Sequence, residues 1–426
     1  MLSALFLGAH FLRMGNFAMA ALPVAALALL FVRSAWVRLV FPYLLIAAGL
    51  LWVDIAIDFI VMRLALGIPW FKLAIILGTV SVLTAASALV FSVKRFKIIY
   101  SSHMKSATHS AVAFALTSCI LVFVNIKVSM PMLLLERFIV GGGWFEIFII
   151  SVYAAWIAQK MANVAASAAW RRKIWLGFSL VFFGQALLGI AGIDSMLMTG
   201  ELHVPVPAVI ITGPIFRGDG FFMPILFVST LILTGPAWCS HLCYFGAFDQ
   251  LAADSKKRPA ALPGWVWTAR IIIFAINVIA AVGLRFWGAS YTFAGVAMLI
   301  FGGLGLGTML VLSRRLGVMI HCTVICPVGL IANHLGKLSP FRVRFKDACD
   351  GCGACSSICK YKALTSNDIK ARIVGQTCTL CGDCIGKCKT AQLEYSFAGL
   401  GGPKARSAFI VIIVSLHAIF LALARI

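Results

Sequence analysis

CDGCGACSSIC (residues 349–359) and CTLCGDCIGKC (residues 378–388) are the two stretches that decide the fold of the C-terminal part of this chain. Each has the spacing Cys-x-x-Cys-x-x-Cys-x-x-x-Cys, which wraps three thiolates around one [4Fe-4S] cluster and gives the fourth thiolate to a second cluster. The spacing therefore predicts two interleaved quartets, Cys349, Cys352, Cys355 and Cys388 for one cluster and Cys378, Cys381, Cys384 and Cys359 for the other.

Structural zinc is the alternative occupant, but zinc sites take two ligands from each of two Cys-x-x-Cys pairs. Two complete four-cysteine runs favour clusters, and glycines within the runs fit loops that need unusual backbone conformations, namely Gly351, Gly353, Gly382 and Gly386. The bacterial pattern has proline after the fourth cysteine, where this chain has Lys360 and Lys389. A lysine at that position either adds positive charge near the cluster, where it could also dock an acidic partner, or is a solvated loop side chain.

Outside these runs, the chain is strongly apolar. It has 426 residues, of which 62% are hydrophobic and 12% are charged, and its mean hydropathy is +1.01. Such a chain needs lipid as its solvent, and apolar runs of about 20 residues are long enough to cross a bilayer. We predict an all-α polytopic membrane bundle from ten such runs, residues 17–32, 39–62, 70–93, 110–124, 144–158, 174–193, 221–238, 265–284, 291–312 and 408–424.

The net charge of +22 comes from basic residues between the apolar runs, so it predicts membrane topology and no nucleic-acid partner. Five basic clusters fall on one face if the amino terminus lies outside, and the positive-inside rule makes that face cytoplasmic. We therefore expect a multi-pass protein of the inner (cytoplasmic) membrane, without a cleaved signal peptide. The clusters are Arg33 with Arg38, Lys94 to Lys97, Arg171 to Lys173, Lys256 to Arg258, and Arg314 with Arg315.

The cysteines fit this topology. Twelve of the 13 cysteines fall on the face predicted to be cytoplasmic, where thiols stay reduced and are available to metals. The remaining one, Cys119, lies within the fourth apolar run, where we expect a small buried hydrophobe.

A second pair of motifs, WCSHLCYFG (residues 238–246) and HCTVICPVG (residues 321–329), follows two of the predicted helices. Cysteines four apart on a helix share one side, so packing of the two helices could join four thiolates at a further iron-sulfur cluster or another metal. A redox-active disulfide and simple packing against the ferredoxin region are alternatives. His241 and His321 are either ligands, proton donors or structural residues. The four cysteines are Cys239, Cys243, Cys322 and Cys326.

The predicted outer loop over residues 193–221 combines apolar residues, three prolines and a few polar groups. Such a loop suits a quinone head group or an external partner, or it caps the helical bundle. The polar candidates are Glu201, His203 and Arg217.

Together these patterns predict four regions. Residues 1–165 form an N-terminal membrane domain of five helices, and residues 166–338 form a membrane domain with both Cys-x-x-x-Cys motifs. Residues 339–399, less apolar and richer in Lys, Asp and Gly, form a small α+β domain of the bacterial 2[4Fe-4S] ferredoxin type. Residues 400–426 form a last transmembrane helix, which tethers the ferredoxin-like domain to the membrane.

The combination of both motif types resembles the NapH, NosR and YccM group of membrane-bound ferredoxin-type proteins. The resemblance spans roughly residues 174–395, although Tyr244 stands where the first motif of that group usually has proline. It implies an electron-transfer subunit, quinol dehydrogenase-like, that takes electrons from quinol or relays them to partner subunits of a membrane oxidoreductase complex. We expect electron transfer between the quinone pool or a membrane partner and a redox partner; the alternative is an iron-sulfur redox sensor, or an assembly factor for a membrane oxidoreductase.

Overall fold

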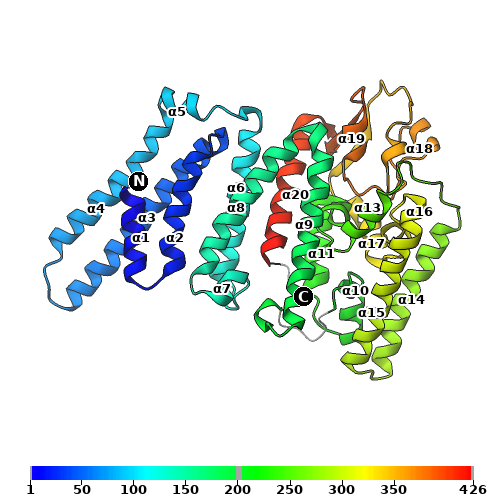
Figure 1. Cartoon of the computed structure of the whole chain (residues 1–426), viewed down its shortest axis with the longest axis horizontal. Coiled ribbons are helices and arrows are strands. Elements are labelled where there is room, and N and C mark those ends of the chain that lie inside the picture. The colour runs from blue at the N-terminus through cyan, green and yellow to red at the C-terminus, as the bar shows by residue number, and fades with distance from the viewer. Residues whose placement is uncertain (1, 198–203, 424–426) are drawn as a thin grey trace. The chain divides into compact units, whose positions relative to one another are not determined.

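A computed structural model describes residues 2–197 and 204–423, and in these residues the chain is mostly helical with a small three-stranded sheet (Figure 1). The chain divides into two compact units, Met1–Gln159 and Lys160–Ile426. All twelve cysteines of the motifs belong to the second unit.

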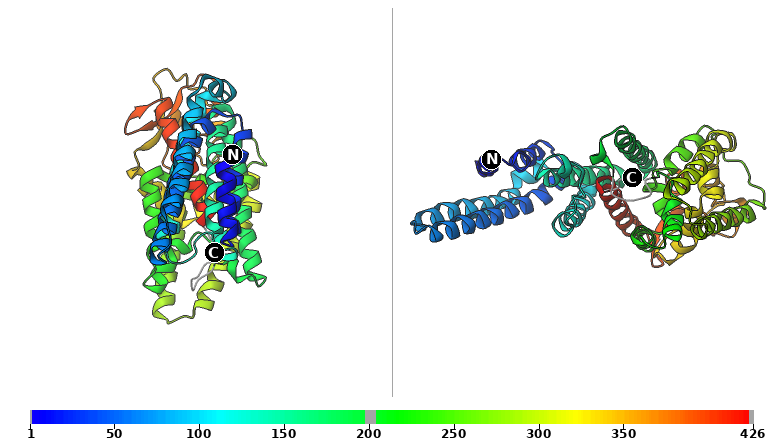
Figure 2. Two further views of the ribbon diagram at one scale, coloured as in Figure 1. Left: turned by 90° about the vertical axis from the view of Figure 1, so that its left-hand side faces the viewer. Right: turned by 90° about the horizontal axis from the view of Figure 1, so that it is seen from below.

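The first unit is a helical bundle whose long helices α3 and α4 form an antiparallel pair (Figure 2). Its core contains Trp36, Phe41 and Phe114, with Phe41 stacked on Phe91 at 5.2 Å between ring centroids. The helices are α1 (Leu2–Arg13), α2 (Phe17–Ala28), α3 (Ala35–Ala65), α4 (Phe71–Ala86), α5 (Lys94–Ile99), α6 (Ala107–Lys127), α7 (Leu134–Phe138) and α8 (Gly142–Ala162), the last of which continues into the second unit.

Among the described residues, nine helices are long and apolar enough to cross a membrane. The first of the ten predicted spans differs, because α2 and the 3₁₀ turn after it form a shorter apolar helix, Phe17–Phe31. The turn before α2 has Gly15 at φ 75° and reverses the chain from α1, a helix of 12 residues that is too short to match the span pattern. The side chain of Asn16 then caps α2 by accepting a hydrogen bond from the backbone N–H of Met19.

Cys119 on α6 contradicts the sequence prediction, because its side chain is exposed rather than buried. It lies on the outward side of an apolar helix, which lipid covers in a membrane protein. The apolar run alone does not distinguish a lipid-facing position from a buried one.

The second unit consists of long apolar helices and the ferredoxin segment, and both parts contain cysteine motifs. Strands and short helices of the ferredoxin segment lie at one end, and α10 and the turn joining α14 to α15 lie at the opposite end (Figures 1 and 2). The elements are α9 (Val164–Ile190), α10 (Val209–Arg217), α11 (Phe222–Thr234), α12 (Trp238–His241), α13 (Gly246–Ala253), α14 (Val266–Phe286), α15 (Tyr291–Thr308), α16 (Arg314–Leu316), α17 (Pro327–Leu335), β1 (Phe341–Phe345), α18 (Ser366–Lys370), α19 (Asp383–Lys387), β2 (Leu393–Phe397), β3 (Leu400–Gly401) and α20 (Pro403–Leu423).

The sheet attaches the ferredoxin segment to α20, the last helix. β1 and β2 pair antiparallel with Val343 opposite Tyr395, and both of these side chains are buried. The ring of Tyr395 stacks on Phe409 of α20 with centroids 4.5 Å apart, and its hydroxyl donates to the carbonyl of Leu380 at 2.8 Å. Tyr395 therefore places the cysteine loop around residue 380 beside α20.

Candidate functional site

The second predicted quartet in the ferredoxin segment gathers at one place. Burial raises the pKa of the Cys384 thiol well above its usual range, and nearby Cys381, Cys378 and Cys359 add to the rise. Cys359 comes from the first run, so the structure brings the fourth cysteine of one run to the first three of the other.

For the first predicted quartet, the structure brings together the three cysteines of one run. Burial likewise raises the pKa of Cys355, and Cys349 and Cys352 lie close enough to add to the rise. Cys388 follows α19 directly and is partly buried.

The two fourth cysteines have matching backbone environments. The N–H of Ala363 donates to Cys359 Sγ at 3.3 Å, and the N–H of Gln392 donates to Cys388 Sγ at 3.3 Å. Each donor lies four residues after its cysteine and directly follows a residue in the left-handed region, Lys362 or Ala391. Backbone N–H groups that donate to sulfur stabilise thiolates. When those thiolates ligate a cluster, the hydrogen bonds also tune the reduction potential of the cluster.

Three of the four predicted loop glycines have a positive φ, a backbone conformation that glycine adopts without steric cost. Gly351, Gly353 and Gly382 have φ of 71°, 72° and 77°. Gly386 differs because it lies within α19, where a Cβ would come within 3.2 Å of the carbonyl oxygen of Val164. Its role is close packing of α19 against the start of α9.

Lys360 is neither a solvated loop side chain nor available to a partner. It is 6% exposed, and its Nζ donates to the carbonyls of Ala253 at 3.0 Å and Lys256 at 2.5 Å. Ala253 ends α13 and Lys256 follows three residues later, so the ammonium lies at the C-terminal end of that helix, where the helix dipole favours a positive charge. Lys389, at the equivalent place in the second run, is exposed.

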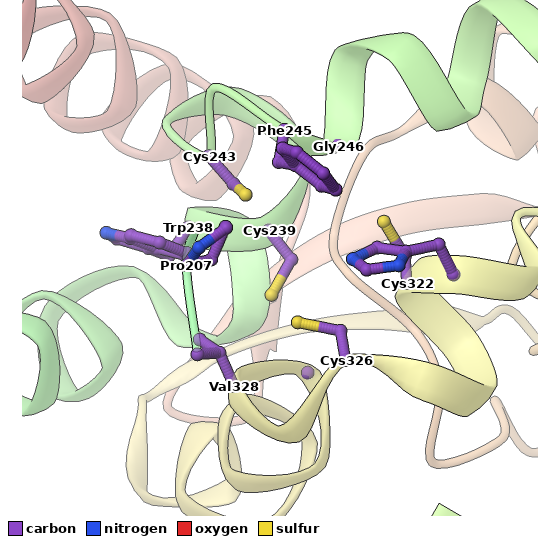
Figure 3. Close-up of a pocket in the computed structure, with 11 residues that line it drawn as sticks. Pro207, Trp238, Cys239, Cys243, Phe245, Gly246, Cys322, Cys326 and Val328 are labelled. Atoms are coloured by element: carbon purple, nitrogen blue, oxygen red, sulfur yellow. The ribbon is translucent and has the colours of Figure 1, made fainter. Parts of the chain in front are cut away.

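The four cysteines of the Cys-x-x-x-Cys motifs line a single cavity (Figure 3). Cys239, Cys243 and Cys326 are buried, and the sulfurs of Cys239 and Cys326 point toward each other. Burial raises the pKa of Cys322 well above its usual range, and nearby Asp249 and the other three cysteines add to the rise. The four cysteines thus meet at one cavity, but Cys243 and Cys326 lie just after α12 and after the helical turn His321–Ile325, and not on one side of a continuous helix as the sequence predicts.

Thiols dominate the donor set of this cavity. Within residues 2–197 and 204–423, no three His, Cys, Asp or Glu side chains converge as ligands of a single metal ion. The four cysteines instead surround a shared space, and four thiolates around a larger body are the donor set of a [4Fe-4S] cluster. The chemistry of this donor set fits such a group, and the cavity that it lines has a volume of about 10 Å³.

The two motifs also repeat each other in their backbone packing. A Cβ on Gly246 would lie 3.1 Å from the carbonyl oxygen of Cys239, and one on Gly329 would lie 2.6 Å from that of Cys322. In each motif the glycine seven residues after the first cysteine therefore lets the chain fold tightly back over that cysteine.

This folding aims backbone N–H groups at the second cysteine of each motif. Burial raises the pKa of Cys243 to about 12. Hydrogen bonds from the backbone N–H groups of Gly246 and Phe245 oppose this rise. Burial also raises the pKa of Cys326, and the N–H groups of Gly329 and Val328 oppose that rise. Cys322 itself lies in a π-helical turn, His321–Ile325, and such turns are frequent at functional sites.

Both types of motif touch one another directly. Ser240, inside the first Cys-x-x-x-Cys, donates from Oγ to the carbonyl of Thr379, inside the second ferredoxin run, at 2.8 Å. Trp175 of α9 donates from Nε1 to the carbonyl of Cys243 at 2.7 Å. Buried Trp175 and Tyr361 form a core cluster against which cysteines of both regions pack, namely Cys322, Cys359 and Cys381.

The two histidines beside the cysteines are buried. His241 Nδ1 lies 2.9 Å from Ser240 Oγ, and the carbonyl of His241 lies 3.1 Å from Nδ1 of His417 on α20. His321 lines the cysteine cavity, where burial lowers its pKa to about 4 and favours the neutral ring.

Of the predicted quinone or partner loop, Glu201 and His203 lie outside the described residues. Arg217 ends α10, and its Nε lies 3.4 Å from Asp219 Oδ1.

The motif patterns miss two charged residues beside the cavity. Asp249 accepts a hydrogen bond from the backbone N–H of Cys322 at 2.9 Å, and Arg270 of α14 is 2% exposed. Arg270 lies near Gly329, whose Cβ would come within 3.6 Å of a guanidinium nitrogen. A single arginine inside an apolar run is the signal that could have identified it.

Comparison with known proteins finds a matching domain profile and two named relatives. A profile described as "4Fe-4S binding domain" matches residues 216–260 and 294–346, the segments that hold both Cys-x-x-x-Cys motifs. The methylamine utilization ferredoxin-type protein MauN of Paracoccus denitrificans is 25% identical over 57% of this chain and 86% of its own length. The putative electron transport protein YccM of Escherichia coli is 24% identical over 48% of this chain and 60% of its own length. No solved structure matches.

These findings confirm the resemblance that rests on the cysteine motifs. Both named relatives are described as ferredoxin-type or electron-transport proteins, and the matched profile binds [4Fe-4S] clusters. The chain is therefore similar to ferredoxin-type electron-transport proteins, and it combines a matched 4Fe-4S binding domain with helices long and apolar enough to cross a membrane.

Proposed function

We propose that this protein passes electrons between the quinone pool or a membrane partner and a cytoplasmic redox partner, through three neighbouring [4Fe-4S] sites. Two sites are the interleaved quartets of the ferredoxin segment, and the third is the cavity of Cys239, Cys243, Cys322 and Cys326. Each bound cluster supplies one-electron transfer.

The observation that carries this proposal is the shared wall between the cavity and the second quartet. Cys322 of the cavity packs against the same buried cluster, Trp175 and Tyr361, as Cys359 and Cys381 of the ferredoxin segment. The hydrogen bond from Ser240 to Thr379 fixes the spacing between the two motifs. A chain of closely packed sites suits a relay of single electrons.

The proposed orientation places the ferredoxin segment on the cytoplasmic side of the inner membrane. Lys256 Nζ donates to the carbonyl of Arg315 at 3.2 Å, which joins two of the basic clusters. Lys360 of the ferredoxin segment binds the carbonyl of Lys256, so both clusters adjoin that segment. Concentrated basic residues at one end of the helices support a cytoplasmic assignment for that end.

Iron content and EPR on the full chain, purified without oxygen, test the proposal. With four irons per cluster, we expect about twelve irons per chain in the wild type and about eight in a Cys239→Ser variant. A Cys119→Ser variant is the matched control and keeps the wild-type content. Equal iron content in Cys239→Ser and wild type would exclude a third cluster at this cavity. Zinc in place of iron would exclude the electron relay.

Electron entry needs a separate measurement. Anaerobic addition of a short-chain quinol is expected to produce the EPR signal of reduced clusters in the wild type. Failure of quinol, together with normal reduction by dithionite, would exclude the quinone pool as donor and leave a protein partner in that role.

A further inference from the structure

A second cavity lies among the membrane helices of the second unit. It has a volume of about 320 Å³ and is bounded by α10, α14 and α15. Most of its lining is hydrocarbon, and its polar side chains are Thr212 and Asn277. Sites for small organic cofactors have this volume range and this pattern of many apolar and few polar groups.

This cavity adjoins the cysteine cavity along two helices. On α14, Ile273 lines it, and Arg270, three residues or about 4.5 Å earlier along the axis, lies beside the cysteines. On α15, Phe301 lines it, and Gly305, four residues later, contacts His321 so closely that a Cβ would lie 2.7 Å from the ring. About one helical turn therefore separates the two cavities on each helix.

The segment before α10 forms a third connection. Pro207, just before α10, lines the cysteine cavity, while Thr212 in the first turn of α10 lines the apolar one and donates to the carbonyl of Ala208 at 3.0 Å. An occupant of the apolar cavity would thus share this wall with the four thiols.

The polar groups restrict what the occupant is. Asn277 is 5% exposed and donates from Nδ2 to the carbonyl of Ile273 at 2.8 Å. A lipid acyl chain in this cavity would need no polar group in the wall, and burying an amide there is costly, so the amide favours an occupant with polar atoms. The second Nδ2 hydrogen of Asn277 can bind a carbonyl oxygen, and Phe216 and Phe301 offer faces for a flat ring.

From this arrangement the geometry points to a binding site for the ring of a lipid-soluble quinone between α10, α14 and α15. The inference rests on the proposed function and deepens it, because it places the membrane carrier next to the cysteine cavity. It also moves the site from the loop of Glu201 and His203 into the helices.

Photolabelling with an azido-decylubiquinone tests this site in the full chain, reconstituted in nanodiscs. We expect the label on peptides of α10, α14 and α15, and we expect excess decylubiquinone to suppress it. An Ala297→Phe variant fills the cavity and is expected to lower labelling by about tenfold, equivalent to about 1.4 kcal/mol of binding. Val296→Phe, at a neighbouring position that is 50% exposed, is the matched control and keeps labelling.

Asn277→Leu provides a second test that keeps the side-chain volume. Its labelling falls several-fold if the amide binds the quinone, while iron content and dithionite reduction report that the variant folds. Label elsewhere in the chain, label that decylubiquinone does not suppress, or full labelling of Ala297→Phe would overturn the site. Normal labelling without reduction of the clusters by decylubiquinol would instead overturn the quinone-linked function and leave this binding site.

Discussion

Arg171 and Asp383 form a buried ion pair, with Nη2 and Oδ2 2.8 Å apart and side chains 0% and 5% exposed. The pair joins α9 of the membrane part to α19 of the ferredoxin segment, 212 residues later in the chain. Arg171 also donates to the carbonyl of Ser240 at 3.1 Å. One guanidinium thus contacts both a Cys-x-x-x-Cys motif and the helix that carries Cys384.

An Arg171→Met variant tests the importance of this ion pair. Methionine keeps much of the volume but leaves the Asp383 carboxylate buried without its cation, and losing one partner of a buried pair costs about 3–5 kcal/mol. The free energy of unfolding, followed by the visible absorption of the clusters in denaturant, is expected to fall by that amount. The neighbouring pair of Arg172 and Asp254 is partly exposed at 3.4 Å, so Arg172→Met serves as the control and should cost at most about 1 kcal/mol. Equal losses in both variants would contradict the assigned role.

The two lysines that replace prolines give a second matched comparison. Lys360→Met removes two hydrogen bonds from a charged donor to the carbonyls of Ala253 and Lys256, at a cost of about 1–3 kcal/mol. Lys389→Met changes an exposed side chain and is expected to change stability by at most about 0.5 kcal/mol. Denaturant unfolding of the two variants checks this, and an unaffected Lys360→Met would show that other groups satisfy the carbonyls.

Some features of the cysteine motifs are local in the sequence, and their surroundings are not. Ligand spacing within each eleven-residue run is local, whereas the assignment of Cys359 to the quartet of Cys384 rests on the pattern of two-cluster ferredoxins and stays a prediction. The burial of Lys360 depends on α13, about 100 residues earlier in the chain, and no local pattern records that contact. The same applies to Cys119, since an apolar run does not state which side of its helix faces lipid.

Membrane spans show the same division. Nine of the predicted apolar runs are long helices in the described residues. The sequence could predict them because the length and hydropathy that a spanning helix needs can be read from the sequence alone. Phe17–Phe31 is shorter, since Gly15 and Asn16 define a turn and a helix start that hydropathy does not detect.

The tight glycines of the Cys-x-x-x-Cys motifs predict a selective loss of the third site. In Gly329→Ala the new methyl group would meet the carbonyl oxygen of Cys322 at 2.6 Å and would push the backbone off Cys326. Iron per chain is expected to fall from about twelve to about eight, with the ferredoxin signals retained. Gly307→Ala on α15 has open space around its Cβ and is the control. Wild-type iron content in Gly329→Ala would show that the loop tolerates the shift.

Tyr361 allows packing to be separated from hydrogen bonding at the wall between the cavity and the second quartet. Its ring is 3% exposed, and its hydroxyl has no hydrogen-bond partner within the part of the chain that the structure describes. Tyr361→Phe therefore removes an unpaired buried polar group and is expected to leave stability unchanged or higher. Tyr361→Ala opens a cavity beside Cys322, Cys359 and Cys381 and is expected to cost about 3–5 kcal/mol.

The same two variants distinguish a packed wall from a hydroxyl with a redox role. If packing alone matters, Tyr361→Phe transfers electrons from quinol to the ferredoxin clusters at the wild-type rate, and Tyr361→Ala is slower. Rapid-freeze EPR after mixing with a short-chain quinol measures both rates. A slow Tyr361→Phe with full iron content would assign the hydroxyl a direct part in the transfer, since the ring and its contacts are otherwise retained.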